Sequence, residues 1–313
     1  NWALLDANWS GSTRADCSGE GACWVFVRER FGQFMYGFFP EGLRWRVNLT
    51  VLLAVAGAAP LFIQRMPRKA VYAAGFLLLY PLLAFWLLHG GFFALEEVPT
   101  SRWGGLMLTL VIAAVGISGA LPLGILLALG RRSDLPAIRV LCVTFIEFWR
   151  GVPLITVLFM SSVMLPLFLP EGLSFDKLVR ALIGVILFQS AYIAEVVRGG
   201  LQAIPKGQYE AAAAMGLGYW RMMGLVILPQ ALKLVIPGIV NTFIALFKDT
   251  SLVIIIGLFD LLNSIKQATA DPAWIGMATE GYVFAALLFW MFCFGMSRYS
   301  MRLERRLDTG HKR

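Results

Sequence analysis

Three groups of ionisable side chains lie within long apolar runs of this 313-residue chain. Glu147 and Arg150 are spaced i, i+3, as are Glu195 and Arg198, so each pair can lie on one helix face and neutralise itself. The run Lys-Asp-Thr-Ser at 248–251 indicates a bend whose polar groups satisfy freed backbone. Ionised side chains are costly inside a bilayer and are by default functional there. These groups therefore indicate either a polar pathway through a membrane or structural ion pairs near one membrane boundary.

The sequence lacks the motifs of several kinds of catalytic site. It contains no G-x-x-x-x-G-K-[ST] motif, so the chain does not bind ATP through a P-loop. His89 and His311 are its only histidines, and no H-E-x-x-H or Cys/His cluster is present, which argues against a metalloenzyme and a histidine-based triad. We therefore expect this chain to contain no catalytic residue and to bind no metal or cofactor.

The four cysteines do not form a metal-binding pattern. Cys142 and Cys293 lie in apolar runs, where we expect them to behave as small buried hydrophobic residues. Cys17 and Cys23 are six residues apart in a polar segment. If that segment is periplasmic, a local disulfide can form there; the alternative is two free thiols.

Composition assigns the chain to the membrane. Hydrophobic residues make up 58% and charged residues 15%, with a mean hydropathy of +0.72, whereas soluble domains contain about 25% charged residues. We expect an all-α integral membrane protein. The excess of 27 Lys and Arg over 19 Asp and Glu lies at the ends of apolar runs. This distribution fits membrane topology and not a nucleic-acid-binding face.

A polar interruption at 206–230 separates two long apolar runs. Its first half is rich in alanine and other good helix formers, and Gly216 and Gly218 then bracket Leu217 at a break or sharp turn. The second half has apolar residues at helical spacing, and we expect Pro229 to end it. The pattern indicates either a helix–turn–helix that docks onto a partner in the water phase or an ordinary amphipathic loop.

Within this interruption Glu210, Ala211 and Ala212 precede Gly216, and the run Ile-Leu-Pro follows at 227–229. These residues resemble the EAA loop of ABC-transporter permease subunits, with its EAA, its glycine and its I-x-LP ending. The flanking segments resemble the polar amino-acid importer branch of that family, and they lie at 147–153, 191–195, 198–200 and 248–252. The resemblance covers about residues 104–307.

This resemblance implies the transmembrane domain of a type I ABC importer in the bacterial inner membrane. The implied partners are a second, similar permease chain, two ATPase subunits that bind ATP and Mg²⁺, and a periplasmic amino-acid-binding protein. The loop would seat in a groove of the ATPase, where Glu210 would face polar or basic groups. The implied coupling residues are Glu210, Ala211, Ala212, Met215, Gly216 and Leu217.

The resemblance also implies a pathway for an amino acid. A zwitterion needs a cation or helix N-terminus for its carboxylate and an anion or carbonyl groups for its ammonium. The residues expected along this pathway are Glu195, Asn241, Asp249, Thr250 and Ser251. For Glu195 and Asp249 a structural role is the alternative. Glu147, Arg150 and Arg198 are expected to form structural ion pairs.

Seven apolar segments of about bilayer length predict membrane spans. They cover about 47–63, 71–88, 104–129, 137–168, 178–198, 231–262 and 281–297. The connecting segments are alternately basic, at 64–69, 131–139, 198–221 and 298–313, and acidic, at 89–97, 169–176 and 263–280. The positive-inside rule then places the interruption and the C-terminus in the cytoplasm and residue 1 in the periplasm.

The N-terminal third is an addition to the core of the resembled family. A periplasmic start without a signal peptide predicts a further upstream helix, hence eight spans in the full chain. We divide the sequence into an aromatic periplasmic or interfacial segment (1–46), extra spans and a loop (47–103), a permease core (104–307) and a cytoplasmic tail (308–313). The long N-terminal part resembles one subunit of the general L-amino-acid permeases.

Two other classes of protein remain as alternatives. A secondary amino-acid transporter would also contain broken helices and midplane charges, but it needs no EAA-like loop and usually shows inverted repeats. A membrane scaffold or channel would explain the spans but not the loop. Co-purification with a P-loop ATPase distinguishes the ABC importer from both.

Overall fold

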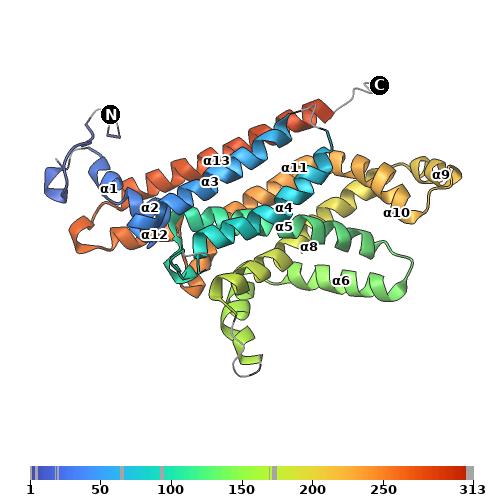
Figure 1. The fold of residues 1–313 in the computed structure, drawn as a ribbon, viewed down its shortest axis with the longest axis horizontal. Coiled ribbons are helices and arrows are strands. Elements are labelled where there is room, and N and C mark those ends of the chain that lie inside the picture. The colour runs from blue at the N-terminus through green and yellow to red at the C-terminus, as the bar shows by residue number, and fades with distance from the viewer. Residues whose placement is uncertain are drawn as a thin grey trace. The chain divides into compact units, whose positions relative to one another are not determined.

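The computed structural model describes residues 2–3, 6–17, 19, 21–63, 67–91, 95–168, 170 and 175–307, and the predicted tail at 308–313 lies outside them. This part of the chain is almost wholly helical, as predicted (Figure 1). Its helices are α1 (Trp24–Glu29), α2 (Phe31–Tyr36), α3 (Arg44–Ala58), α4 (Lys69–His89), α5 (Gly105–Arg131), α6 (Pro136–Gly151), α7 (Leu154–Phe159), α8 (Lys177–Ala203), α9 (Lys206–Ala214), α10 (Tyr219–Met222), α11 (Leu228–Asp249), α12 (Leu261–Thr269) and α13 (Ala278–Leu307). Met223–Ile227 is a π-helical turn, Thr250–Ile256 is a 3-10 turn, and β1 (Phe259–Asp260) is a two-residue strand.

Five helical segments in the described part of the chain are long and apolar enough to cross a membrane. They are Val71–His89, Gly105–Arg131, Lys177–Ala203, Tyr219–Ile256 and Ala278–Leu307. The segments Pro136–Gly151 and Leu154–Phe168 meet at an angle of 103° and count as a sixth if they form one broken span.

The predicted span at 47–63 is not among these segments. α3 has 15 residues and gives way to a 3-10 turn that contains Pro60. At about 1.5 Å per residue, such a helix is roughly 22 Å long, which is shorter than the hydrocarbon core of about 30 Å. The sequence-based count of seven spans did not allow for this early end of the α-helix.

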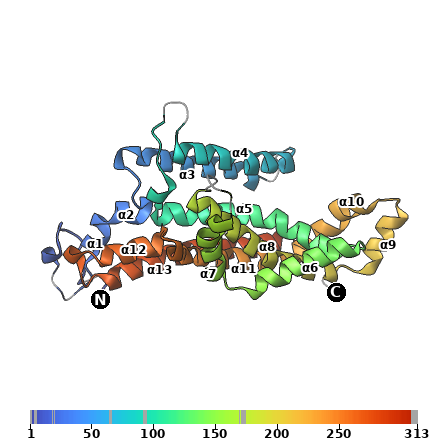
Figure 2. The same ribbon diagram turned by 90° about the horizontal axis from the view of Figure 1, so that it is seen from below.

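The chain divides into two compact units, and unit 1 comprises residues 1–115, 168–180 and 251–287. Within it α3 and α4 run side by side (Figures 1 and 2). The fully buried Arg46 donates to the carbonyls of Leu87 at 2.6 Å and Glu96 at 2.8 Å. Because Leu87 lies in the last turn of α4, this cation satisfies a carbonyl at the helix end.

The aromatic residues of the N-terminal segment are partly inside unit 1. Phe26 and Phe34 are fully buried, and their rings are 5.6 Å apart. The ring of Phe26 also lies 5.4 Å from that of Trp274, between α12 and α13 in sequence. The predicted bilayer-facing segment therefore has a core of its own, and part of its aromatic content serves folding.

Unit 2 comprises residues 116–167, 181–250 and 288–313. Its core consists of small and branched side chains, among them Ala128, Ile193 and Ile227, from α5, α8 and the π-helical turn. Glycines allow the helices to approach closely: a Cβ at Gly124 would lie 2.7 Å from Ile193, and one at Gly200 would lie 2.7 Å from the carbonyl oxygen of Ala231. Small residues at helix contacts are typical of membrane-spanning bundles.

Candidate functional site

The interruption at 206–230 begins with α9, which ends at a glycine turn. Gly216 has a φ of +74°, in the left-handed region that glycine adopts without steric cost. Its N–H donates to the Ala213 carbonyl at 2.9 Å, and the N–H of Leu217 donates to the Ala212 carbonyl at 3.2 Å. This pair of bonds is a Schellman motif, which satisfies carbonyls at the end of a helix. The turn thus depends on the conformation of Gly216.

The loop exposes large apolar side chains. Met215 is 81% exposed, and Trp220 and Leu225 are each 71% exposed. Glu210 and Ala211 are exposed beside them on α9. Large apolar side chains exposed within one loop are typical of surfaces that contact another protein or a membrane. The loop therefore has the composition of a docking surface.

Ala212 differs in burial from the other predicted coupling residues. It is only 5% exposed and lies one helical turn after Tyr209, which packs against the core of unit 2. Ala212 therefore faces the interior of its own chain, and its packing into a partner groove stays a prediction.

The loop is fixed to unit 2 at its second end. Met223 and Ile227 are buried in the core. The side-chain amide of Gln230, in α11, donates to the side-chain oxygen of Gln208 at 3.1 Å and to the Val226 carbonyl at 2.9 Å. Figures 1 and 2 both show α9 and α10 next to each other.

Pro229 does not end the helical segment, contrary to the prediction. The helical chain continues from Tyr219 to Asp249, and Pro229 occupies the first turn of α11 after the π-helical turn. The π-helical turn directly before it accommodates the proline, because local π-helical adjustments satisfy the backbone groups that a proline frees within a helix.

Charged side chains of three helices gather around Glu195, whose side chain is 15% exposed. The Arg131 guanidinium lies 2.7 Å from the Glu195 carboxylate and 3.0 Å from that of Glu147. Arg198 lies 2.9 Å and Arg150 3.7 Å from Glu195. We call these five residues the Glu195 cluster. With three guanidiniums and two carboxylates it carries one excess positive charge.

The pairing within this cluster differs from the prediction in one respect. Glu195 and Arg198 form the expected i, i+3 pair, whereas Glu147 pairs with Arg131 and Arg150 lies near Glu195. An i, i+3 pair contributes only about 0.2–0.5 kcal/mol, so partners on neighbouring helices displace it. Arg131 served only as a marker of orientation in the sequence-based prediction, although its place at the end of a span was a signal for a contact with a neighbouring helix.

The other residues expected on the pathway have separate environments. Thr250 is 1% exposed, and its hydroxyl donates to a carbonyl in the last turn of α11. The Ser251 carbonyl accepts a hydrogen bond from the side-chain amide of Asn263 at 2.8 Å. Asn241 is exposed and Asp249 is half-buried. Of the five, Glu195 is the residue that the structure places among several opposite charges.

No group of three or more His, Cys, Asp and Glu side chains in the described ranges is arranged to hold a metal ion. In the Glu195 cluster the carboxylates face guanidiniums, so their oxygens already have charged partners. The described part of the chain thus presents a docking loop and an ion-pair cluster.

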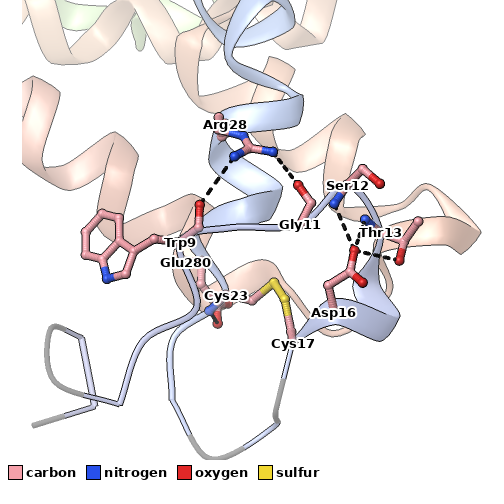
Figure 3. Close-up of a disulfide and its surroundings, with 9 residues drawn as sticks. All are labelled: Trp9, Gly11, Ser12, Thr13, Asp16, Cys17, Cys23, Arg28 and Glu280. Atoms are coloured by element: carbon pink, nitrogen blue, oxygen red, sulfur yellow. Dashed lines mark hydrogen bonds between the residues drawn. A yellow bond between two sulfur atoms is a disulfide. The ribbon is translucent and has the colours of Figure 1, made fainter.

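Cys17 and Cys23 are joined by a disulfide, with their Cα atoms 5.6 Å apart (Figure 3). The backbone N–H of Cys23 donates to the carboxylate of Glu280 at 3.0 Å in a buried contact. Arg28 reaches the carbonyl of Gly11 with its guanidinium. The N-terminal segment around the disulfide is therefore attached both to α1 and to the first turn of α13.

A tight turn directly before the disulfide loop is closed by Asp16 (Figure 3). Its carboxylate accepts from the backbone N–H groups of Ser12 and Thr13, both at 2.8 Å, and from the Thr13 hydroxyl at 3.0 Å. These hydrogen bonds lower the pKa of Asp16 below its ordinary value because they favour the ionised carboxylate, and the bond from the Ser12 N–H contributes most.

Residues 120–309 match the family described as binding-protein-dependent transport system inner membrane component. The chain is 71% identical over 310 residues to the inner membrane amino-acid ABC transporter permease protein YhdY of Escherichia coli (strain K12), which covers 99% of this chain and 84% of that protein. It is 42% identical over 378 aligned residues to the glutamate/glutamine/aspartate/asparagine transport system permease protein BztC of Rhodobacter capsulatus, covering 99% of this chain and 86% of the relative. The crystal structure of an amino acid ABC transporter with histidines matches with a TM-score of 0.57 at 28% identity, over 65% of this chain and 92% of that one.

Proposed function

Since the chain belongs to the family of binding-protein-dependent transport system inner membrane components, we propose that it carries polar L-amino acids from periplasm to cytoplasm by alternating access. It is a multi-pass inner-membrane permease subunit of an ABC amino-acid importer, and the ATPase is a separate subunit. The family predicted from the EAA-like loop is thereby confirmed. The likeness to BztC supports glutamate, glutamine, aspartate and asparagine as the first substrates to test.

The observation that carries the transport mechanism is the exposed apolar surface of the loop at 206–230. Its exposed side chains lie between the end of α9 and the π-helical turn, and the loop continues into α8 at one end and into α11 at the other. A partner that moves this loop therefore acts on two membrane helices. The coupling residues that we propose are Glu210, Ala211, Met215, Gly216 and Leu217.

In the proposed cycle ATP and Mg²⁺ bind to a pair of ATPase subunits, whose closure displaces the loop and opens the pathway toward the periplasm. A binding protein then delivers the amino acid. Family membership implies an ATPase and a binding protein as partners. A second, similar but non-identical permease chain completes the pathway, since the N-terminal addition favours two different chains.

We propose seven spans for this chain, with the loop and the C-terminus in the cytoplasm. The count includes the broken α6–α7 segment and α3 extended by the turn Ala59–Phe62. The Cys17–Cys23 disulfide supports a periplasmic N-terminal segment, because disulfides persist in oxidising compartments. We keep 1–46, 47–103, 104–307 and 308–313 as the proposed divisions.

We place the amino-acid pathway along Glu195, Asn241, Asp249, Thr250 and Ser251. The excess positive charge of the Glu195 cluster supports this choice, because a substrate carboxylate is attracted to a site with a surplus guanidinium. Asn241 is exposed on α11 of unit 2 and can face a partner chain.

The test of the function is ATP hydrolysis by the purified assembly in liposomes, with and without binding protein plus each of the four amino acids. We expect stimulation only when binding protein and a transported amino acid are both present, together with ATP-dependent uptake. Uptake driven by an ion gradient, with no co-purifying ATPase, would instead support a secondary transporter.

A further inference from the structure

The junction between α8 and α9 contains a carbonyl that the helix itself leaves without a donor. The Leu201 carbonyl lies in the last turn of α8, where the usual donor would be the N–H of residue 205. Residue 205 is proline, which has no N–H. Because Leu201 is 1% exposed, this carbonyl needs another partner from within the protein.

Two side chains supply that partner. Arg132, the residue after α5, donates to the Leu201 carbonyl at 2.9 Å and to the Tyr209 hydroxyl at 3.0 Å. The Tyr209 hydroxyl, in α9, donates to the same carbonyl at 3.1 Å. The guanidinium also lies over the Tyr209 ring, 5.5 Å from its centroid. Three helix ends thus meet at one oxygen atom.

The neighbouring arginine makes a second attachment to α8. Arg131 binds Glu195, six residues before Leu201 on the same helix. Consecutive arginines at the end of α5 therefore hold α8 at two points, one in the Glu195 cluster and one at the junction with α9. A cation at the C-terminal end of α8 also interacts favourably with the helix dipole.

We propose that Arg132 and Tyr209 are positioning residues that lock α9 to α8, so that displacement of the 206–230 loop moves α8 and the Glu195 cluster as one body. Without this lock Pro205 would act as a hinge, because it removes the backbone bond that would otherwise continue α8 into α9. The inference rests on the proposed coupling of this loop to an ATPase. It adds the residues by which movement passes from the loop into the membrane helices.

Tyr209→Phe tests the lock, because it removes the hydroxyl and keeps the ring that packs against unit 2. The matched control is Tyr80→Phe in unit 1, which removes a tyrosine hydroxyl that likewise donates to a backbone carbonyl, that of Thr50 at 3.0 Å, and keeps the ring stacked on Phe76. Both variants and wild type are reconstituted with the ATPase and binding protein. The quantity measured is the number of ATP molecules hydrolysed per amino acid imported.

We expect Tyr209→Phe to raise this ratio about three- to tenfold at unchanged ATPase content, since one hydrogen bond shifts an equilibrium by about that factor. Tyr80→Phe should leave the ratio unchanged. Arg132→Gln should raise it further than Arg132→Lys, which keeps a cation for the Leu201 carbonyl. If Tyr209 and Arg132 served only stability, the variants would lower the amount of assembled transporter. The number of ATP molecules hydrolysed per amino acid imported would then stay unchanged in the complexes that do assemble.

An unchanged ratio in both Tyr209→Phe and Arg132→Gln, with the ATPase still bound, would overturn the lock while leaving the coupling loop intact. If wild type itself showed no ATPase association, the proposed function would fail and the lock with it. The wild-type measurement therefore separates the two failures.

Discussion

Replacing Gly216 by alanine would test the turn that ends α9 and orients the exposed side chains of the loop. Gly216 has a φ of +74°, and no atom lies within 4 Å of the position that a Cβ would take. An added methyl group therefore meets no neighbour. The whole cost arises from the left-handed backbone, which disfavours any residue with a side chain.

The size of this cost follows from the backbone conformation. An L-residue in the left-handed region loses roughly 1–2 kcal/mol relative to glycine. About 1 kcal/mol corresponds to a fivefold change in the equilibrium constant between the native turn and alternatives that extend or unwind α9. We therefore expect Gly216→Ala to lower the ratio of correctly turned to alternative loops about fivefold.

Gly218→Ala is the matched control. Gly218 has a φ of −64° and open space around it, so alanine fits the native backbone there. In liposomes, amino acid imported per ATP hydrolysed should fall several-fold for Gly216→Ala and remain near wild type for Gly218→Ala. Equal behaviour of the two variants would refute the claim that the left-handed turn positions the coupling surface.

Three further outcomes follow from the contacts described above. Replacing Cys17 and Cys23 by serine should destabilise the N-terminal loop by roughly 2 kcal/mol, because the disulfide no longer removes the entropy of closing a loop of about seven residues in the unfolded chain. The hydrogen-exchange rate of the loop should rise, and unchanged exchange would contradict this. Because the folded-state pKa of Asp16 is lowered, its stabilisation is present above the ordinary value of about 3.9 and is lost as pH falls through the folded value. The difference in exchange between wild type and Asp16→Asn should therefore shrink below about pH 4, whereas a difference independent of pH would exclude the carboxylate as its cause. Arg131→Gln should lower the free energy of unfolding by about 1–2 kcal/mol, because it leaves the mostly buried Glu195 with fewer partners. Glu147→Gln should lower it less, since the Glu147 side chain is 55% exposed. Thermal unfolding in detergent measures both, and equal losses would argue against a central role for Arg131.

The features predicted correctly from the sequence are those set by local chemistry. The polar interruption at 206–230 and the helical character of the spans follow from residue type over short windows, and the turn at Gly216 follows from one residue. The Glu195–Arg198 pair lies within one helix. Each of these depends on residues a few positions apart, where spacing determines geometry.

The features missed depend on which helices are neighbours. Arg131 reaches Glu195 across 64 positions of sequence, and no spacing rule connects them. The burial of Ala212 was missed because the face of α9 that it occupies is fixed by Tyr209 packing on unit 2. The length of α3 was overestimated because hydropathy continues past residue 58 while the α-helix does not.

Pro205 shows how part of this missing information can be inferred before any fold is known. A proline four residues after a buried helical carbonyl removes one donor, and the protein must then supply another from elsewhere. The candidates are side chains with several donors at helix ends facing the same membrane boundary, and the Arg131–Arg132 pair satisfies that condition. Pro205 thus separates α9 from α8 and leaves the Leu201 carbonyl without its backbone donor. Arg132 and Tyr209 connect the two helices through hydrogen bonds to that same carbonyl.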